Sequence, residues 1–273
     1  MTSVPAITRI LGVDFSGARF PASRIWIAEI TGRPGEARLA ACYSLAERLG
    51  QRADRDTCYR QLRGLLGGPP GTAAGLDFPF SLPASLVRAS SWEAVLQWVA
   101  RRFATPDAFR AYCRRQADQG EPKRDTDRLA RVPMAPSNLR LYRQTYYGMA
   151  RILAPLVREQ AVAVLPFHPP DPNKPWLLEV CPASYLKQKG LYQPYKGRRS
   201  ALADRRAQLL HQLFRQEGLL LPAPDLAEKI ARQPGGDALD AVLAALCVYR
   251  ALQADSLQPP LKGAAALEGW IYF

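Results

Sequence analysis

The sequence predicts an α/β domain in which helices flank a mixed β-sheet. Three observations support this fold class: β-like runs open the chain, helical patterns alternate with later strand-like runs, and 48% hydrophobic residues suffice for a buried core. The length of 273 residues fits one domain, expected to span residues 1–273. A mainly helical stretch at about residues 82–160 follows the fourth predicted strand, and we interpret it as a helical insertion.

The first third of the chain predicts an antiparallel meander, a helix and a fourth strand. Short loops containing glycine and proline separate the first three apolar runs, which is typical of hairpin-connected strands. Residues 47–68 have a helical pattern that stops at a pair of glycines. Residues 71–80 predict a buried strand ending at Asp77, because Pro79 cannot continue the ladder. The first three strands are expected at residues 7–15, 24–30 and 36–45.

The insertion begins with two amphipathic patterns and a charged segment. Helices are expected at residues 90–103 and 105–117. The second should start with Thr105 as its N-cap and Pro106 in its first position, since both residue types favour those places. Residues 121–136 are charged and interrupted by prolines, which predicts an exposed loop.

A long helix over residues 137–159 closes the insertion. Apolar residues recur there at three- and four-residue steps, which predicts one buried face. This apolar stripe consists of Leu139, Tyr142, Tyr146, Met149, Leu153 and Leu156. The remaining elements are strands at residues 161–167 and 176–182 and helices at 200–214 and from 235 onward. The tail LEGWIYF is so apolar that we expect it to pack on the core.

Positive charge gathers in the middle of the chain. The net charge is +13, and residues 101–210 carry 21 basic and 9 acidic side chains. A clustered basic surface is typical of proteins that contact phosphate-rich partners such as nucleic acid. Since 30 of the 37 basic residues are arginine, a bias in composition is the alternative explanation.

Several classes of protein are disfavoured by the sequence. No apolar run approaches the roughly 18–20 residues of a membrane span. The N-terminus lacks the basic and apolar regions of a secretory signal, so we expect a cytoplasmic protein without a membrane partner. The five cysteines form no CxxC pair and only two histidines are present, which argues against a structural zinc site or a disulfide framework.

Carboxylates occupy the ends of predicted elements. Asp14 ends the first strand and Asp77 the fourth, Glu179 interrupts an apolar strand, and Asp237 and Asp240 open the last helix. Such carboxylates are rare in apolar strands unless a partner offsets their desolvation. Mg²⁺ or Mn²⁺ would be such a partner, because Mg²⁺ prefers a few carboxylates and leaves room for substrate phosphates. Two such ions about 4 Å apart can assist displacement at a phosphodiester.

Each carboxylate also has a structural interpretation. Asp14 and Asp77 could form strand-ending turns, and Glu179 could pair with a basic segment. Asp237 follows two glycines and could cap the helix, where the helix dipole favours a negative charge. Asp237 and Asp240 share one helix face, and the alanines after Asp240 would let this helix lie close to the sheet.

Together these segments resemble a known family. LGVDFSGA, AGLDFPFSLP, LLEVCPASYLK, YKG and GGDALDAVLAA followed by EGWIY are similar to the motifs of the domain-of-unknown-function family 429, over about residues 7–273. Members of that family are described as predicted RNase H-like nucleases. The resemblance implies an RNase H-like fold: three antiparallel strands, then parallel strands alternating with helices.

The same resemblance implies roles for the carboxylates. Asp14 and Asp77 would bind metal from the first and fourth strands, and Asp240 together with Asp237 from the last helix. This order also resembles RuvC-type Holliday-junction resolvases, which have glutamate where this chain has Asp77. Glu179 belongs to the motif of family 429 but has no counterpart in the resolvase pattern.

The sequence therefore predicts a divalent-metal-dependent nuclease. The predicted catalytic residues are Asp14, Asp77, Asp240 and Glu179, and the predicted metal ligands are Asp14, Asp77, Asp237 and Asp240. The predicted substrate contacts are Ser16, Lys196, Arg198 and Arg199, joined by arginines of the insertion. DNA, RNA, a junction and a small nucleotide all stay open as substrates.

Three other functions remain possible from sequence. The basic middle segment could bind nucleic acid without catalysis. GVDFSGA is similar to the first phosphate loop of actin-like ATPases, although Phe15 replaces its glycine and no second glycine loop is present. Ser184 and Lys187 form a Ser-x-x-Lys pattern found in acyl-transfer enzymes, but the companion motifs of those enzymes are missing.

Overall fold

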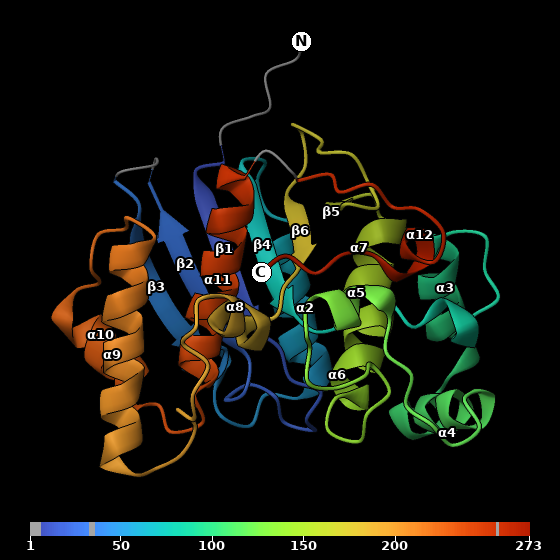
Figure 1. The fold of residues 1–273 in the computed structure, drawn as a ribbon, viewed down its shortest axis with the longest axis horizontal. Coiled ribbons are helices and arrows are strands. Elements are labelled where there is room, and N and C mark those ends of the chain that lie inside the picture. The colour runs from blue at the N-terminus through green and yellow to red at the C-terminus, as the bar shows by residue number, and fades with distance from the viewer. Residues whose placement is uncertain (1–6, 33–35, 255–256) are drawn as a thin grey trace.

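Six strands form one mixed sheet in the order β3-β2-β1-β4-β6-β5 (Figure 1). The structure is a computed structural model that describes residues 7–32, 36–254 and 257–273. The strands are β1 (Arg9–Asp14), β2 (Trp26–Thr31), β3 (Arg38–Ser44), β4 (Thr72–Asp77), β5 (Ala163–Leu165) and β6 (Trp176–Glu179). β1, β2 and β3 are antiparallel neighbours, whereas β4, β5 and β6 run parallel to β1. The predicted meander and the predicted α/β class are thus confirmed.

Helices cover both faces of the sheet. The helices before β5 are α1 (Ala46–Leu49), α2 (Arg55–Leu66), α3 (Trp92–Arg102), α4 (Pro106–Gln116), α5 (Asp125–Leu129), α6 (Tyr142–Tyr147) and α7 (Ala154–Arg158), with short helical turns η1 (Ala84–Leu86) and η2 (Gly148–Leu153). The helices after β6 are α8 (Pro182–Gln188), α9 (Ser200–Gln216), α10 (Pro224–Arg232), α11 (Asp237–Gln253) and α12 (Ala265–Glu268). Figure 1 shows α11 lying across the sheet and the insertion helices gathered beyond β6.

Alternation along the strands divides the core into two layers. Leu11 and Val13 of β1 pack with α2 and the insertion, whereas Ile10 packs with α9 and α11 on the other face. This two-residue period is the expected consequence of the β-pleat. Both faces of the central strands are therefore buried, which explains why β1 and β4 are almost continuously apolar.

The predicted helix at residues 47–68 is divided into α1 and α2. Gly50 has a φ of +87°, which ends α1 in a conformation that L side chains rarely adopt. The chain restarts at Asp54, whose side chain accepts a hydrogen bond of 2.7 Å from the Thr57 backbone N–H. This N-cap, rather than a continuous pattern, defines the start of α2.

The insertion contains the predicted helices, with one correction at the third. Thr105 caps α4 and Pro106 is its first residue, as predicted. The long helix begins at Tyr142 rather than residue 137 and continues through α6, η2 and α7 to Arg158. Leu139 therefore precedes the helix and is 63% exposed, so its assignment to the buried stripe was wrong. The other members of the stripe are buried.

The prediction of an exposed loop at residues 121–136 is also wrong. This segment contains α5, and the side chains of Arg124 and Asp127 are almost completely buried. Their burial is possible because Arg124 pairs with Asp127 and with Glu179 of β6. A charged segment can enter the core when its charges meet partners there.

Helix α11 lies unusually close to β1. A Cβ atom on Gly12 would come within 2.0 Å of the Ala241 carbonyl oxygen and 2.2 Å of the Ala245 backbone nitrogen. The small residues on both sides allow this approach, as the alanine-rich sequence of α11 predicts. The contact brings the beginning of α11, including Asp240, to the ends of β1 and β4.

The C-terminal tail packs on the core as predicted. Ile271 and Tyr272 are buried, and the Tyr272 backbone N–H donates to the Glu179 carbonyl oxygen at 2.9 Å. Within the described ranges, no helix combines the length and apolar composition needed to span a bilayer. Residues 1–6, on which the prediction of no secretory signal partly depends, lie outside those ranges.

Candidate active site

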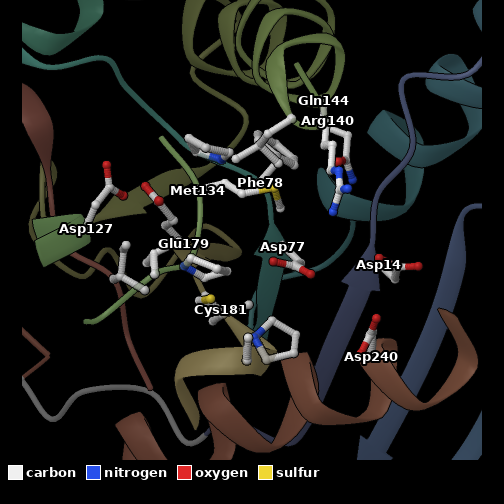
Figure 2. Close-up of a pocket in the computed structure, with 18 of the residues that line it drawn as sticks. Asp14, Asp77, Phe78, Asp127, Met134, Arg140, Gln144, Glu179, Cys181 and Asp240 are labelled. Atoms are coloured by element: carbon white, nitrogen blue, oxygen red, sulfur yellow. The ribbon is translucent and has the colours of Figure 1, made fainter. Parts of the chain in front are cut away.

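Asp14 and Asp77 occupy equivalent positions at the ends of two adjacent strands. β1 and β4 are parallel, and Asp14 is paired in register with Asp77. Parallel strands place their carboxyl ends at one edge of the sheet, which is where α/β proteins commonly bind ligands. Asp240, in the first turn of α11, reaches the same edge (Figure 2). The structure thus brings together three predicted site residues from β1, β4 and α11.

These three carboxylates line one end of a cavity of about 890 Å³. Its walls come from the strand ends of β4 and β6, the insertion, the beginning of α8 and the segment at residues 192–196. Lys196 lies in the wall beside Asp240. Arg140 of the insertion also contributes to the wall and lies beside Gln144 (Figure 2). The wall of the cavity therefore combines these three carboxylates with two cationic side chains, Lys196 and Arg140.

Negative charge at this end is only partly compensated. Burial, followed by the charges of Asp240 and Asp77, raises the pKa of Asp14 well above its usual range. Burial and the charge of Asp240 likewise raise the pKa of Asp77 to about 7. Within the described ranges, no hydrogen-bond donor reaches either carboxylate, so strand-ending Asx turns do not account for them. Buried, mutually repelling carboxylates are typical of functional sites.

Asp240 is held by two side chains of the YKG segment. The Tyr195 hydroxyl donates to Asp240 Oδ1, and Lys196 Nζ forms an ion pair with Oδ2. Burial opposes the charge on Lys196, but Asp240, Asp14 and Asp77 outweigh it and raise the pKa of the ammonium group. Burial and Asp240 raise the pKa of Tyr195, so its hydroxyl stays protonated and donates. Lys196, predicted as a phosphate contact, is thus a partly exposed counter-ion of Asp240 in this structure.

Asp237 lies beside this cluster without lining the cavity. It is the first residue of α11, and Gly236 with a φ of +80° occupies the N-cap position, so Asp237 is not the cap. Its carboxylate accepts from Gln233 Nε2 at 3.3 Å and lies 3.7 Å from Arg24 Nη1. Burial raises the pKa of Asp237, while Lys196 and Arg24 oppose this effect.

Glu179 is engaged in a buried ion pair at the other side of the cavity. Its Oε2 accepts from Arg124 Nη1 and from the Phe80 backbone N–H, both at 2.9 Å, and its Oε1 pairs with Arg124 Nη2. Asp127 binds the same guanidinium, with Oδ1 2.7 Å from Nη2. The salt-bridge interpretation of Glu179 is confirmed, but its partner comes from the segment that sequence assigned to an exposed loop.

The other predicted substrate contacts are less central. Ser16 Oγ accepts from the Ala18 backbone N–H at 3.3 Å, and Ser16 is not part of the cavity wall. Arg198 and Arg199 are exposed just before α9 and also lie outside the wall. Three further arginines of the insertion line a separate hollow of about 330 Å³ on α4, namely Arg110, Arg114 and Arg115.

The Ser-x-x-Lys pattern does not form a nucleophile–base pair. Ser184 is buried and its hydroxyl has no hydrogen-bond partner among the described residues. Lys187 Nζ instead donates to the Arg131 carbonyl oxygen at 2.7 Å. An activated serine needs its base within hydrogen-bond reach, so this pair lacks the contact that acyl transfer requires.

The carboxylate oxygens of this cluster are suitable ligands for a divalent cation, but the side chains are not yet placed to hold one. Carboxylate oxygens are the ligands that Mg²⁺ and Mn²⁺ prefer, and the cluster carries more negative than positive charge. However, no group of three or more His, Cys, Asp or Glu side chains in the described part of the chain is already placed to hold an ion. Both oxygens of Asp240 are engaged by Tyr195 and Lys196, so an ion at Asp240 would compete with the positive charge of Lys196.

Comparison with known proteins gives no identification. No protein-family model, curated protein or solved structure matches the chain. The site must therefore be interpreted from its own geometry and chemistry.

Replacing Asp77 by asparagine is expected to stabilise the protein in EDTA at pH 8 by roughly 1–3 kcal/mol. Its carboxyl pKa is about 3.9 in the unfolded chain and about 7 in the folded protein. The folded state therefore binds more protons within this window, and stability is lost as the pH rises through it. The gain in Asp77→Asn should thus grow from pH 4.5 to pH 8, as measured by urea unfolding.

Asp204→Asn is the matched control for this experiment. Asp204 is an exposed residue of α9, and its substitution should change stability little at any pH. If Asp77→Asn raised the free energy of unfolding equally at pH 4.5 and pH 8, the pKa of Asp77 could not be raised in the folded protein.

Proposed function

We propose that this protein is a divalent-metal-dependent hydrolase of nucleic-acid phosphodiesters with an RNase H-like fold. The observation that carries the proposal is the meeting of Asp14, Asp77 and Asp240 at one end of an open cavity. Their mutual repulsion costs stability, and proteins tolerate such a cost mainly at sites under selection for function. The positive charge of the middle segment supports an anionic polymer as the substrate.

In this proposal the three aspartates hold Mg²⁺ or Mn²⁺, with Asp14 between Asp77 and Asp240. Divalent ions there would neutralise phosphate charge and make water nucleophilic at neutral pH. Release of Lys196 from Asp240 would leave its ammonium group free to contact a substrate phosphate. Arg140 could bind a second phosphate from the cavity wall. Tyr195 would keep Asp240 oriented, because its hydroxyl stays protonated.

Two predicted site residues receive lesser roles. We infer that Glu179 positions the cavity wall through Arg124 rather than binding an ion, since both of its oxygens already accept hydrogen bonds. Asp237 adds negative charge near Asp14 from outside the cavity. Neither residue is needed as a ligand in the proposed reaction.

The fold supports the RNase H-like part of the proposal. An antiparallel meander followed by parallel strands, with carboxylates on the first strand, the fourth strand and the last helix, agrees with what the resemblance to family 429 implies. The sixth strand lies outside β4, next to β5, and does not disturb the edge where the carboxylates meet.

Nucleic-acid binding without catalysis is the second candidate. It is favoured by the ion pair between Lys196 and Asp240, which neutralises one carboxylate without any metal. In this function the cluster would stay occupied by Lys196, and the basic side chains would contact phosphates independently of sequence.

A cleavage panel separates the two functions. Labelled DNA and RNA oligonucleotides, single- and double-stranded, are incubated with the protein in Mn²⁺, in Mg²⁺ and in EDTA. The hydrolase is expected to cleave at least one substrate in a divalent ion, to lose this activity in EDTA and to regain it when Mn²⁺ is restored. Binding that falls steeply with salt, without cleavage in either ion, would instead favour the second candidate.

A further inference from the structure

The cavity extends from the three aspartates toward Asp127 (Figure 2). On that side its wall includes Val132 and Ile271, which pack together. Tyr192 of the wall lies near them, because Lys187 contacts both its ring and the Arg131 carbonyl oxygen. We call this part of the wall the apolar end. Arg124 and Asp127 also contact it, but their charges are satisfied by the buried ion-pair network. A ligand that fills the whole cavity must therefore place an apolar body at this end, and under the proposed function its phosphate would lie at the aspartates once they hold a divalent ion.

Tyr192 is the exposed aromatic side chain of this wall. It is 52% exposed, and the Lys187 ammonium group lies 5.0 Å from the centre of its ring. Accessible aromatic rings in a binding cavity can form stacking platforms for nucleobases. A planar base is an apolar body of the right kind, and the phosphate beside it supplies the anionic group.

The size of the cavity limits how a nucleic acid can enter. A volume of about 890 Å³ is in the range of pockets that bind small molecules. In a duplex the bases are paired and stacked inside the helix, so a base can reach such a pocket only after extrusion. Single strands pay much less for unstacking one base.

We propose that the apolar end of the cavity is a subsite for one unstacked nucleobase, held against Tyr192. The substrate class is then single-stranded nucleic acid, or a nucleotide extruded from a duplex. This inference rests on the proposed function, because the phosphate of the same nucleotide would lie at the aspartates. It goes further by assigning Tyr192 and the apolar wall to recognition of the base.

Binding is measured first, so that the result does not depend on turnover. Fluorescence anisotropy in Ca²⁺ compares labelled single strands of DNA and RNA, a blunt DNA duplex, and a wholly abasic strand that keeps the phosphates. Tyr192→Ala is expected to weaken single-strand binding about 5- to 100-fold, the effect of losing one stacked base. Tyr192→Phe should bind like the wild type, because the ring is retained.

Two comparisons make this result specific to the base. Tyr192→Ala should change binding of the abasic strand and of the duplex less than twofold, since neither places a base in the cavity. Leu139→Ala is the control for removing an exposed apolar side chain of the insertion, because Leu139 is 63% exposed and lies outside the cavity wall. If Tyr192→Ala weakened binding of the abasic strand as much as binding of the ordinary strand, the proposed base subsite would be wrong.

Cleavage in Mn²⁺ distinguishes failure of this inference from failure of the proposed function. Tyr192-dependent binding of single strands without any cleavage would support the base subsite and contradict the hydrolase. Cleavage of single strands at an unchanged kcat/KM in Tyr192→Ala would support the hydrolase and overturn the base subsite. Efficient cleavage of an intact duplex, equal to that of single strands, would also overturn it.

Discussion

Asp14→Asn is expected to lower the rate of metal-dependent cleavage by at least about 1,000-fold. Burial, followed by the charges of Asp240 and Asp77, raises the pKa of Asp14 well above its usual range. Under the proposed function Asp14 would be one of the three carboxylates that hold the ion. Asparagine keeps the shape of the side chain but removes the charge that an ion would need, so loss of activity would report on ligation. Initial rates in Mn²⁺ on the best substrate of the cleavage panel provide the measurement.

Asp237→Asn is the matched control for this substitution. Asp237 is a neighbouring aspartate of the same cluster but lies outside the cavity wall, and its removal should reduce the rate less than about 10-fold. Asp14→Asn should also fold at least as well as the wild type, because it removes an uncompensated charge. Equal activity of Asp14→Asn and wild type, with both proteins folded, would place the chemistry elsewhere.

The element that carries each aspartate could be predicted from the sequence, because each of these predictions depends on a local pattern. Strand β1 is a short apolar run that ends at Asp14, β4 ends at Asp77 before a proline, and α11 begins after a pair of glycines. Asp14 and Asp77 meet because β1 and β4 are adjacent and parallel, an arrangement that no local pattern of the sequence specifies. Asp240 follows because the alanines of α11 and Gly12 permit close packing.

The partners of these carboxylates could not be predicted in the same way. Lys196 pairs with Asp240 across 44 positions in the sequence, and Arg124 pairs with Glu179 across 55. No local pattern distinguishes a lysine that contacts a substrate from one that neutralises an aspartate. Likewise, the charged and proline-rich surroundings of Arg124 have the composition of an exposed loop. Only the tertiary structure shows that this arginine is inside.

Arg124→Met is expected to lower the free energy of unfolding by about 3–5 kcal/mol. Arg124 is completely buried and binds Asp127 and Glu179 as well as the Glu268 carbonyl oxygen at 3.1 Å. Without the guanidinium, two buried carboxylates lose their counter-charge, which costs more than the pair itself contributes. The α5 segment, β6 and the C-terminal tail would lose a common contact. Urea unfolding at pH 8 measures the change, and thermal melting should fall by on the order of 10 °C.

Two further variants test whether uncompensated charge is the cause. Arg128 is an exposed arginine of the same segment that pairs with Asp125, and Arg128→Met should change stability by no more than about 0.5 kcal/mol. The triple variant Arg124→Met, Asp127→Asn, Glu179→Gln removes both carboxylate charges and should regain part of the lost stability.

The pH dependence of Arg124→Met gives an independent test of the same cause. Burial already raises the pKa of Glu179 against the opposing charge of Arg124, so loss of Arg124 would raise it further. The folded state would then bind more protons, so its stability should recover as the pH falls from 8 to 5. The difference from wild type should therefore be larger at pH 8 than at pH 5. A deficit independent of pH, unrelieved in the triple variant, would show that Arg124 stabilises the fold through packing alone.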